Sequence, residues 1–168
     1  MSRFRSLAKP SNKAASVLAL VALLTVTPTT ASNAGNGVPR CGGKVATIVG
    51  TAARDHIVGT DNADVIVGRG GNDTILAGRG RDRVCGKRGS DGIHGNEGGD
   101  PFLKGGKGHD FAEGDDGDDR LKGGRGPDFL LGTEGDDRLD GGRGRDTCRG
   151  QDGHDIKRNC ERTPAAPG

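Results

Sequence analysis

An apolar side chain recurs at one fixed position along the middle of this chain, every nine residues with one step of ten. Most of its neighbours are polar or small, so only one side chain of each segment has to turn inward. Because side chains alternate between the two faces of a strand, each segment fits a very short strand of three residues. The pattern predicts an all-β chain. The repeated positions are Ile57, Ile66, Ile75, Val84, Ile93, Phe102, Ala112, Leu121, Leu130, Leu139 and Cys148, and the last repeat has Lys157 there.

Aspartate follows the same register, two residues before each inward position, from Asp55 to Asp155. The step is nine residues except between Asp100 and Asp110, where it is ten. With aspartate as position six, glycine occupies position one in eleven of twelve repeats and position four in ten. Glycine adopts backbone conformations closed to other residues and lets the main chain approach an ion. Ordinary turns also use Gly and Asp, but a strict register over about a hundred residues favours a repeat architecture.

A second period of eighteen residues lies within the first. Residues 105–122 match residues 123–140 at 11 of 18 positions, whereas a shift of nine residues matches only 3 of 9. Position three alternates in charge, with Lys107, Arg125 and Arg143 against Asp116, Glu134 and Asp152. Two nonamers per turn would stack like residues one strand spacing apart, ~4.8 Å. We therefore expect a basic edge, an acidic edge and two aspartate columns whose repulsion cations would relieve.

The nonamer resembles the G-G-x-G-x-D-x-U-x repeat of the RTX, or haemolysin-type, calcium-binding family. Clear copies are Gly105–Glu113 (GGKGHDFAE), Gly123–Leu131 (GGRGPDFLL) and Gly141–Arg149 (GGRGRDTCR). The resemblance implies a right-handed parallel β-roll over residues 50–158, with Ca²⁺ between successive turns. It implies the metal ligands Asp73, Asp82, Asp91, Asp100, Asp110, Asp119, Asp128, Asp137 and Asp146, with the turns of Gly71, Gly80, Gly89, Gly108, Gly117, Gly126, Gly135 and Gly144.

Several repeats depart from that pattern. The first two lack the position-four glycine, so Asp55 and Asp64 are expected to be weaker ligands in a capping turn, and Asp155 lies at the other end. The extra residue near Lys104, beside Pro101, predicts a bulge or a break in the ion column. Because each ion requires six to eight oxygens, about six to eight good sites are expected.

Composition indicates how such a chain would be stabilised. It contains 33 glycines, no Trp and no Tyr, so large apolar side chains are scarce. Glycine loses more backbone freedom on folding than other residues, and something besides a broad apolar core must offset this cost. We expect the metal-free chain to be mostly disordered and Ca²⁺ binding to drive folding.

The N-terminus is typical of a secreted protein. Four basic residues precede an apolar run, residues 14–26, that is too short for a membrane span of ~20 residues. We interpret residues 1–34 as a signal peptide cleaved after Ala34 or Ala31, an uncleaved anchor being the alternative. Its removal leaves 21 of the 25 Lys and Arg residues against 23 Asp and Glu. A cap over residues 35–49 and a tail over residues 159–168 would flank the repeats.

Four cysteines in an exported chain suggest two disulfides. In the roll, Cys85 and Cys148 are three and a half turns apart, ~17 Å along the axis, whereas a disulfide needs Cα atoms within ~7 Å. Cys85–Cys160 fails likewise, and Cys41 lies farther still from either C-terminal cysteine. The pairing expected is therefore Cys41–Cys85 and Cys148–Cys160, one at each end of the solenoid.

The sequence offers little support for other functions. It has no H-E-x-x-H or G-x-S-x-G motif, and its four histidines are expected to be solvated turn or strand residues, so we predict no enzyme. Gly-Arg steps recur, but interleaved acids and few aromatics argue against nucleic-acid binding. The remaining alternative is an extracellular structural or adhesive scaffold with structural Ca²⁺ and a cell-surface or matrix partner.

Overall fold

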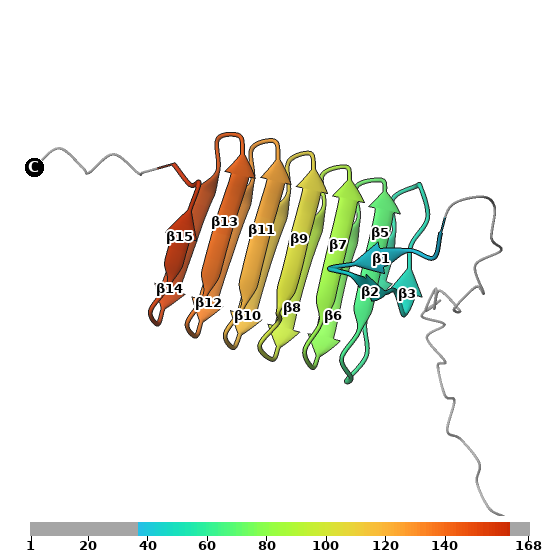
Figure 1. The fold of residues 1–168 in the computed structure, drawn as a ribbon, viewed down its shortest axis with the longest axis horizontal. Helices are drawn as coiled ribbons and strands as arrows, with labels where there is room; N and C mark the ends of the chain where they lie inside the picture. The colour runs from blue at the N-terminus through green and yellow to red at the C-terminus, as the bar shows by residue number, and fades with distance from the viewer. Residues whose placement is uncertain (1–36, 162–168) are drawn as a thin grey trace, which may run out of the picture.

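The chain folds into a flattened solenoid of parallel strands, seen in the computed structural model, which describes residues 37–161 (Figure 1). Within these residues all fifteen regular elements are strands. A seven-stranded sheet contains β3 (Ile48–Val49), β5 (Val65–Gly70), β7 (Arg83–Arg88), β9 (Phe102–Lys107), β11 (Arg120–Arg125), β13 (Arg138–Arg143) and β15 (Ile156–Arg158). A six-stranded sheet contains β4 (His56–Val58), β6 (Thr74–Arg79), β8 (Gly92–Glu97), β10 (Phe111–Asp116), β12 (Phe129–Glu134) and β14 (Thr147–Asp152).

The eighteen-residue period is the register of both sheets. Leu121 pairs with Leu139 in one sheet and Ala112 with Leu130 in the other, each eighteen residues on. Consecutive strands along the chain belong to opposite sheets, so each turn of the solenoid takes two nonamers. The predicted β-roll architecture is therefore confirmed.

The strands are longer than the sequence pattern predicts. From β5 to β14 each runs six residues, from position seven of one repeat to position three of the next, whereas three were expected. Pairing extends into the glycine-rich half, where Gly124 pairs with Gly142 and Arg125 with Arg143 on the next turn. Only positions four to six remain for the turn.

The core is one inward residue from each strand. Ile66, Ile75, Leu121 and Leu130 are among its fully buried members. The expectation that Phe102 points inward was wrong: Leu103 is the buried residue, and it pairs with Val84 and Leu121. The extra residue of that repeat therefore lies before the strand, around Pro101.

A bulge or a break in the ion column was expected near Lys104, and the described ladder of aspartate hydrogen bonds continues past this point without a break. Both sheets continue across the insertion with a step of nineteen residues, since Asp100 N–H donates to Asp119 Oδ1 at 2.7 Å. On the other edge, Asp91 N–H donates to Asp110 Oδ1 at 3.0 Å. A turn can absorb one residue outside the strands, so the register on both sides survives.

The two edges of the roll carry opposite charge, as position three predicts. The C-terminal ends of β7, β9, β11 and β13 form the basic edge, which consists of Arg88, Lys107, Arg125 and Arg143. The ends of β8, β10, β12 and β14 form the acidic edge, which consists of Glu97, Asp116, Glu134 and Asp152. Arg79 begins the acidic edge and pairs with Glu97 at 2.9 Å.

Both ends of the solenoid are covalently tied. Cys41 is bonded to Cys85 and Cys148 to Cys160, each with Cα atoms 5.7 Å apart, in agreement with the pairing expected from the axial spacing. The first bond holds an antiparallel hairpin, β1 (Arg40–Cys41) and β2 (Lys44–Val45), across the outer face of β5 and β7 (Figure 1). At the other end Lys157 is exposed beside exposed neighbours, because β15 is the outermost strand of its sheet within residues 37–161.

The signal peptide predicted for residues 1–34 lies outside the described residues, as does the end of the tail beyond residue 161. Across residues 37–161 no helix has the length and apolar character needed to cross a membrane.

Candidate metal centre

The position-six aspartates line the inside of the turns at both edges of the roll. Nine of them, Asp73 to Asp146, are at most 4 % exposed, although a carboxylate is among the groups least often buried without a partner. The eighteen-residue register separates them into two columns, one behind each edge. The nine are Asp73, Asp82, Asp91, Asp100, Asp110, Asp119, Asp128, Asp137 and Asp146.

One oxygen of each carboxylate holds neighbouring turns together. Oδ1 accepts a hydrogen bond from the backbone N–H of the aspartate one turn earlier, as from Asp110 to Asp128 at 3.0 Å and from Asp119 to Asp137 at 2.9 Å. The same bond recurs from Asp55 through the first column to Asp146 and from Asp64 through the second to Asp155. Two columns are present, as the eighteen-residue period predicts.

The second oxygen, Oδ2, is buried without a hydrogen-bond partner in nine repeats within residues 37–161. These are the nine aspartates that the sequence nominates as metal ligands. A buried charged oxygen costs several kcal/mol unless a partner compensates it, so each requires a proton or a cation. The donor set therefore fits a bound metal ion, with Oδ2 as the side-chain ligand.

The first two position-six aspartates, Asp55 and Asp64, differ from these nine because their Oδ2 atoms have hydrogen-bond partners. Asp55 Oδ2 accepts hydrogen bonds from the backbone N–H and hydroxyl of Thr51, at 2.6 and 3.0 Å. Asp64 Oδ2 is bound in the same way by Thr60, at 2.8 Å from each group. Thr51 and Thr60 thus provide the partner that Oδ2 lacks in the next nine repeats, and these turns have the character of the cap expected from the missing position-four glycines. Thr133 also occupies position two, but it has φ of 91° and its buried hydroxyl has no hydrogen-bond partner within residues 37–161.

Burial raises the pKa of the ligand carboxyls from Asp73 to Asp137. It raises the pKa of Asp119 to about 8 and of Asp100 and Asp110 to about 7, from 3.8. The hydrogen bond at Oδ1 opposes this shift, and neighbouring aspartates of the same column add to it. Without a cation, the columns hold protons near neutral pH.

The position-four glycines named as site residues allow successive turns to stack. Gly126, for example, has φ of 117°, and a Cβ there would collide with the carbonyl oxygen of Gly108 one turn earlier. Gly71, Gly80, Gly89, Gly108, Gly117, Gly135 and Gly144 also have positive φ and a close backbone neighbour. Their contribution in this structure is a turn narrow enough to enclose the aspartates.

Replacing Gly126 with Ala is expected to cost about 2 kcal/mol or more of folding free energy, from positive φ together with the collision. Gly43→Ala is the matched control, because Gly43 has φ of 83° but open space around its Cα. Chemical unfolding in excess Ca²⁺ measures both. Equal losses in the two variants would show that stacking imposes no steric demand at position four.

Position-one glycines border the second carboxylate oxygen, and sequence reasoning did not select them. A Cβ added to Gly114 would strike Asp119 Oδ2 and lie 2.7 Å from the carbonyl oxygen of Gly132. The small space at Gly114 Cα is therefore lined by a carboxylate and a carbonyl oxygen, and a side chain would fill it. The sequence did contain a signal for these residues, since position one is glycine in eleven of twelve repeats.

A separate cluster lies on the outer face of the six-stranded sheet. His94, Glu113 and Asp115 have ligand atoms within 4.8 Å of one another, and His94 Nδ1 lies 3.2 Å from Glu113 Oε2. His94 is half-buried against Phe111 rather than solvated as expected. Mixed nitrogen and oxygen ligands suit transition metals better than Ca²⁺, so this cluster is chemically distinct from the aspartate columns.

Comparison with known families identifies the repeat. The model for the RTX calcium-binding nonapeptide repeat matches in four copies, at residues 49–84, 58–93, 94–130 and 123–156. The chain belongs to the RTX calcium-binding nonapeptide repeat family. No curated protein matches it. The RTX repeat is a calcium-binding element rather than a catalytic one, and its β-roll is the fold described above.

Proposed function

We propose that this RTX protein binds several Ca²⁺ ions along its two aspartate columns and that binding is coupled to folding. The observation that carries the proposal is the set of nine buried Oδ2 atoms without a hydrogen-bond partner among the described residues. A cation next to each would replace the solvation that folding removes. The nine aspartates are the proposed side-chain ligands, with turn carbonyls completing the oxygen shell.

Calcium suits this donor set better than other biological cations. It takes six to eight oxygens in flexible geometry, whereas Mg²⁺ demands a near-ideal octahedron and dehydrates reluctantly. Carboxylate and carbonyl oxygens are the groups that surround the space at Gly114. The four cysteine sulfur atoms are engaged in disulfides toward the two ends of the roll.

Coupling to folding follows from how little else stabilises the roll. The buried apolar core is a double row of single side chains, while each ligand aspartate has to lose its hydration. An ion that binds only the folded chain stabilises it by RT ln(1 + [L]/Kd), about 2.7 kcal/mol for one site at a hundredfold excess over Kd. The summed stabilisation from several such sites would exceed the free energy of unfolding of a typical small domain.

We also propose an extracellular location, which would suit this function. The N-terminal sequence has the basic and apolar segments of a signal peptide, and disulfides persist in oxidising compartments. Both features point to secretion into a medium where Ca²⁺ is plentiful.

Far-UV circular dichroism with and without millimolar Ca²⁺ tests the coupling, and calorimetric titration counts the ions. At pH 8, the least favourable condition for the metal-free roll, we expect a β-sheet spectrum only with Ca²⁺, and much weaker ordering with equal Mg²⁺. An unchanged β-sheet spectrum after chelation, with no heat of Ca²⁺ binding, would refute the proposal. An unchanged spectrum with measurable binding would retain the sites and refute only the coupling.

A further inference from the structure

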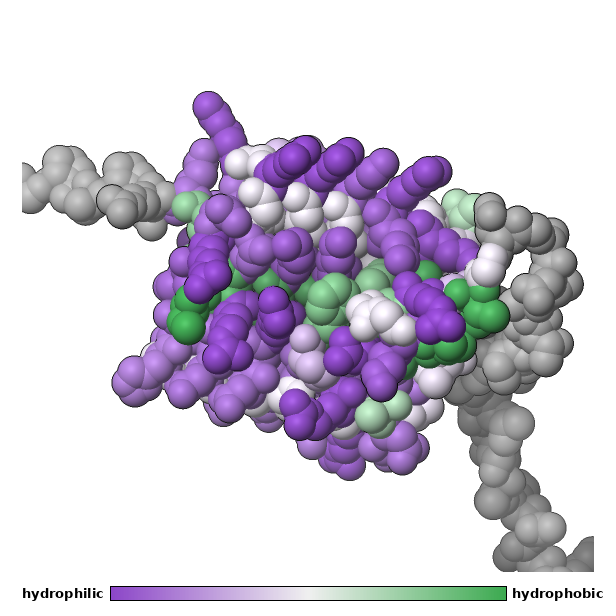
Figure 2. All heavy atoms as spheres, in the orientation of Figure 1, coloured by the Kyte–Doolittle hydropathy of each residue, from purple (hydrophilic) through white to green (hydrophobic). Residues whose placement is uncertain are grey.

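The outer face of the seven-stranded sheet has a groove that the calcium columns do not use. It has a volume of about 710 Å³ and crosses β7, β9, β11 and β13 along the axis of the roll. In Figure 2, pale residues cross the upper half of this face, between strongly hydrophilic residues at the upper edge and others below. The β1–β2 hairpin bounds one end through Gly42, and Asn159 bounds the other.

Glycine at position two forms the floor of the groove. Gly106, Gly124 and Gly142 pair in register on neighbouring strands. The repeat does not dictate glycine at this position, because the other sheet has Asn96, Asp115, Thr133 and Gln151 there, at φ between 67° and 91°. At the three glycines themselves the turns stack more closely, and an added Cβ would collide with a carbonyl oxygen one turn earlier. Three neighbouring strands of this sheet therefore lack a side chain at position two, and this leaves an open channel. The RTX-like repeat pattern alone would not have produced it, since other residues occupy position two elsewhere.

Basic side chains line both walls. Lys107, Arg125 and Arg143 of the basic edge form one wall and are exposed. Lys104 and Lys122 belong to the other wall, and Lys87 lies toward the hairpin. Along each wall the cations recur at one strand spacing, ~4.8 Å.

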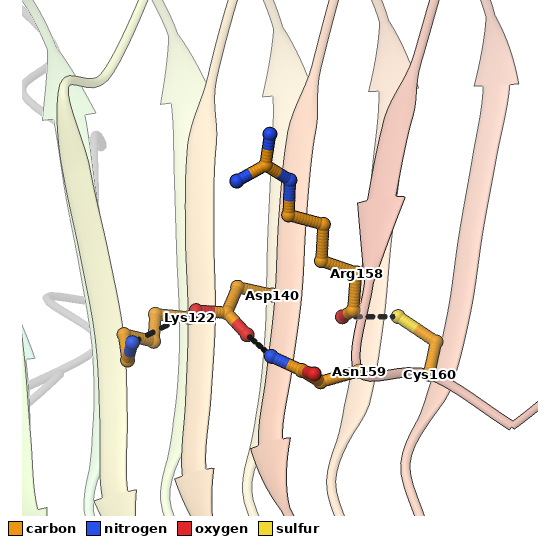
Figure 3. A network of polar contacts seen from close by, with 5 residues as sticks. All are labelled: Lys122, Asp140, Arg158, Asn159 and Cys160. Atoms are coloured by element: carbon orange, nitrogen blue, oxygen red, sulfur yellow. Dashed lines mark hydrogen bonds and ion pairs between the residues drawn. The ribbon is translucent and has the colours of Figure 1, made fainter.

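The carboxylate in the described lining is already compensated. Asp140 Oδ2 is 2.8 Å from Lys122 Nζ, and its Oδ1 accepts a hydrogen bond from the Asn159 side chain at 2.7 Å (Figure 3). The hydrogen bond from Lys122 is the main cause of a lowered pKa at Asp140. Lys104 and the three cations of the opposite wall remain available to an anionic ligand.

We propose that this groove binds a linear acidic polysaccharide whose anionic groups recur at about one strand spacing. A sugar residue is about as long as that spacing, so a chain with one carboxylate per sugar meets a new cation at each turn of the roll. Arginine binds carboxylates through two parallel hydrogen bonds, which favours Arg125 and Arg143 as the main contacts. The groove is open along its length, which suits a polymer passing through rather than a small molecule.

Other polyanions match less well. An extended acidic peptide advances ~3.3 Å per residue and loses register with the walls after a few turns. Single-stranded nucleic acid gains much of its affinity from stacking on aromatic rings, and Phe102 is the one aromatic residue in the described lining. The acidic edge on the far side of the roll repels a polyanion and restricts it to this face.

Binding of a short oligogalacturonate to the disulfide-bonded protein in a fixed excess of Ca²⁺ tests the proposal, with calorimetry as the readout. Arg125→Ser with Arg143→Ser is expected to weaken binding about tenfold, since the variant loses two exposed charge pairs with the ligand. Arg120→Ser with Arg138→Ser is the matched control, because these exposed arginines lie on the same two strands outside the groove. The control should bind like wild type.

The glycine floor provides a second comparison. Gly124→Asn should block the groove, whereas Gly78→Asn places the same side chain at position two of the opposite sheet, where φ is also positive. Thermal melts in Ca²⁺ verify folding, and the arginine pairs decide the outcome if Gly124→Asn does not fold. Equal binding by the two arginine pairs, retained binding to the methyl-esterified oligosaccharide, or equal or tighter binding to single-stranded oligothymidylate would each overturn the proposal.

Discussion

Without calcium, the folded roll is expected to be most stable in mild acid and to lose stability as the pH rises from about 4 to 8. Burial raises the folded-state pKa of Asp91, Asp128 and Asp137 to about 6, of Asp100 and Asp110 to about 7 and of Asp119 to about 8. In the unfolded chain these carboxyls titrate near 3.8. Between those values the folded state holds more protons, so stability falls as the pH rises.

The expected effect is large because several carboxyls contribute. One unit of difference between folded and unfolded pKa corresponds to about 1.4 kcal/mol. Even three of these groups would change stability by about 5 kcal/mol or more, which is comparable with the whole free energy of unfolding of a small domain. The stabilisation is complete below the unfolded pKa and is lost as the pH passes through the folded values of 6 to 8.

Saturating Ca²⁺ is expected to reverse this dependence. The ion requires ionised carboxylates, so protons compete with it and the calcium-loaded protein loses stability as the pH falls. Thermal melts from pH 4 to 8, one series with chelator and one with millimolar Ca²⁺, should give curves of opposite slope that cross. A chelated protein that is as stable at pH 8 as at pH 5 would show that the buried aspartates do not control folding.

Asp119→Asn is expected to have opposite effects with and without calcium. Asparagine retains the Oδ1 acceptor for the Asp100 N–H and removes the buried charge, so the metal-free roll should become more stable. With Ca²⁺ the variant lacks one charged ligand, and we expect a loss of about 3 kcal/mol, as when one partner of a buried ion pair is removed. Calcium titrations followed by circular dichroism would show a higher midpoint.

The neighbouring residue provides the control. Asp118 is exposed at position five, and its Oδ1 accepts a hydrogen bond from the Asp136 N–H at 2.9 Å, which asparagine can also accept. Asp118→Asn changes the same charge one residue away and should leave the calcium midpoint almost unaltered. If both variants shift the midpoint equally, the effect of Asp119 is general electrostatics rather than ligation.

Much of this fold can be read from the chain because a solenoid repeats its contacts. Each turn touches only the turns before and after it, so an interval of eighteen residues specifies which side chains become neighbours. That is why Leu121 and Leu139, the two charged edges and both disulfides were accessible from spacing alone. The nine aspartates with an unpartnered oxygen were accessible for the same reason, since a column of carboxylates is a periodic feature.

The spacing of residues does not determine how closely the backbones of successive turns approach each other. The six-residue strands, the inward turn of Leu103 in place of Phe102, and the oxygen-lined space at Gly114 depend on backbone positions that the periodicity leaves open. The same holds for His94 and Glu113, nineteen residues apart, and for the groove above Gly124. Periodicity determines which residues are neighbours. Burial, hydrogen bonding and free volume between turns are properties of the folded chain, and because they leave the aspartate Oδ2 atoms buried without a hydrogen-bond partner, a cation or proton has to compensate the charge.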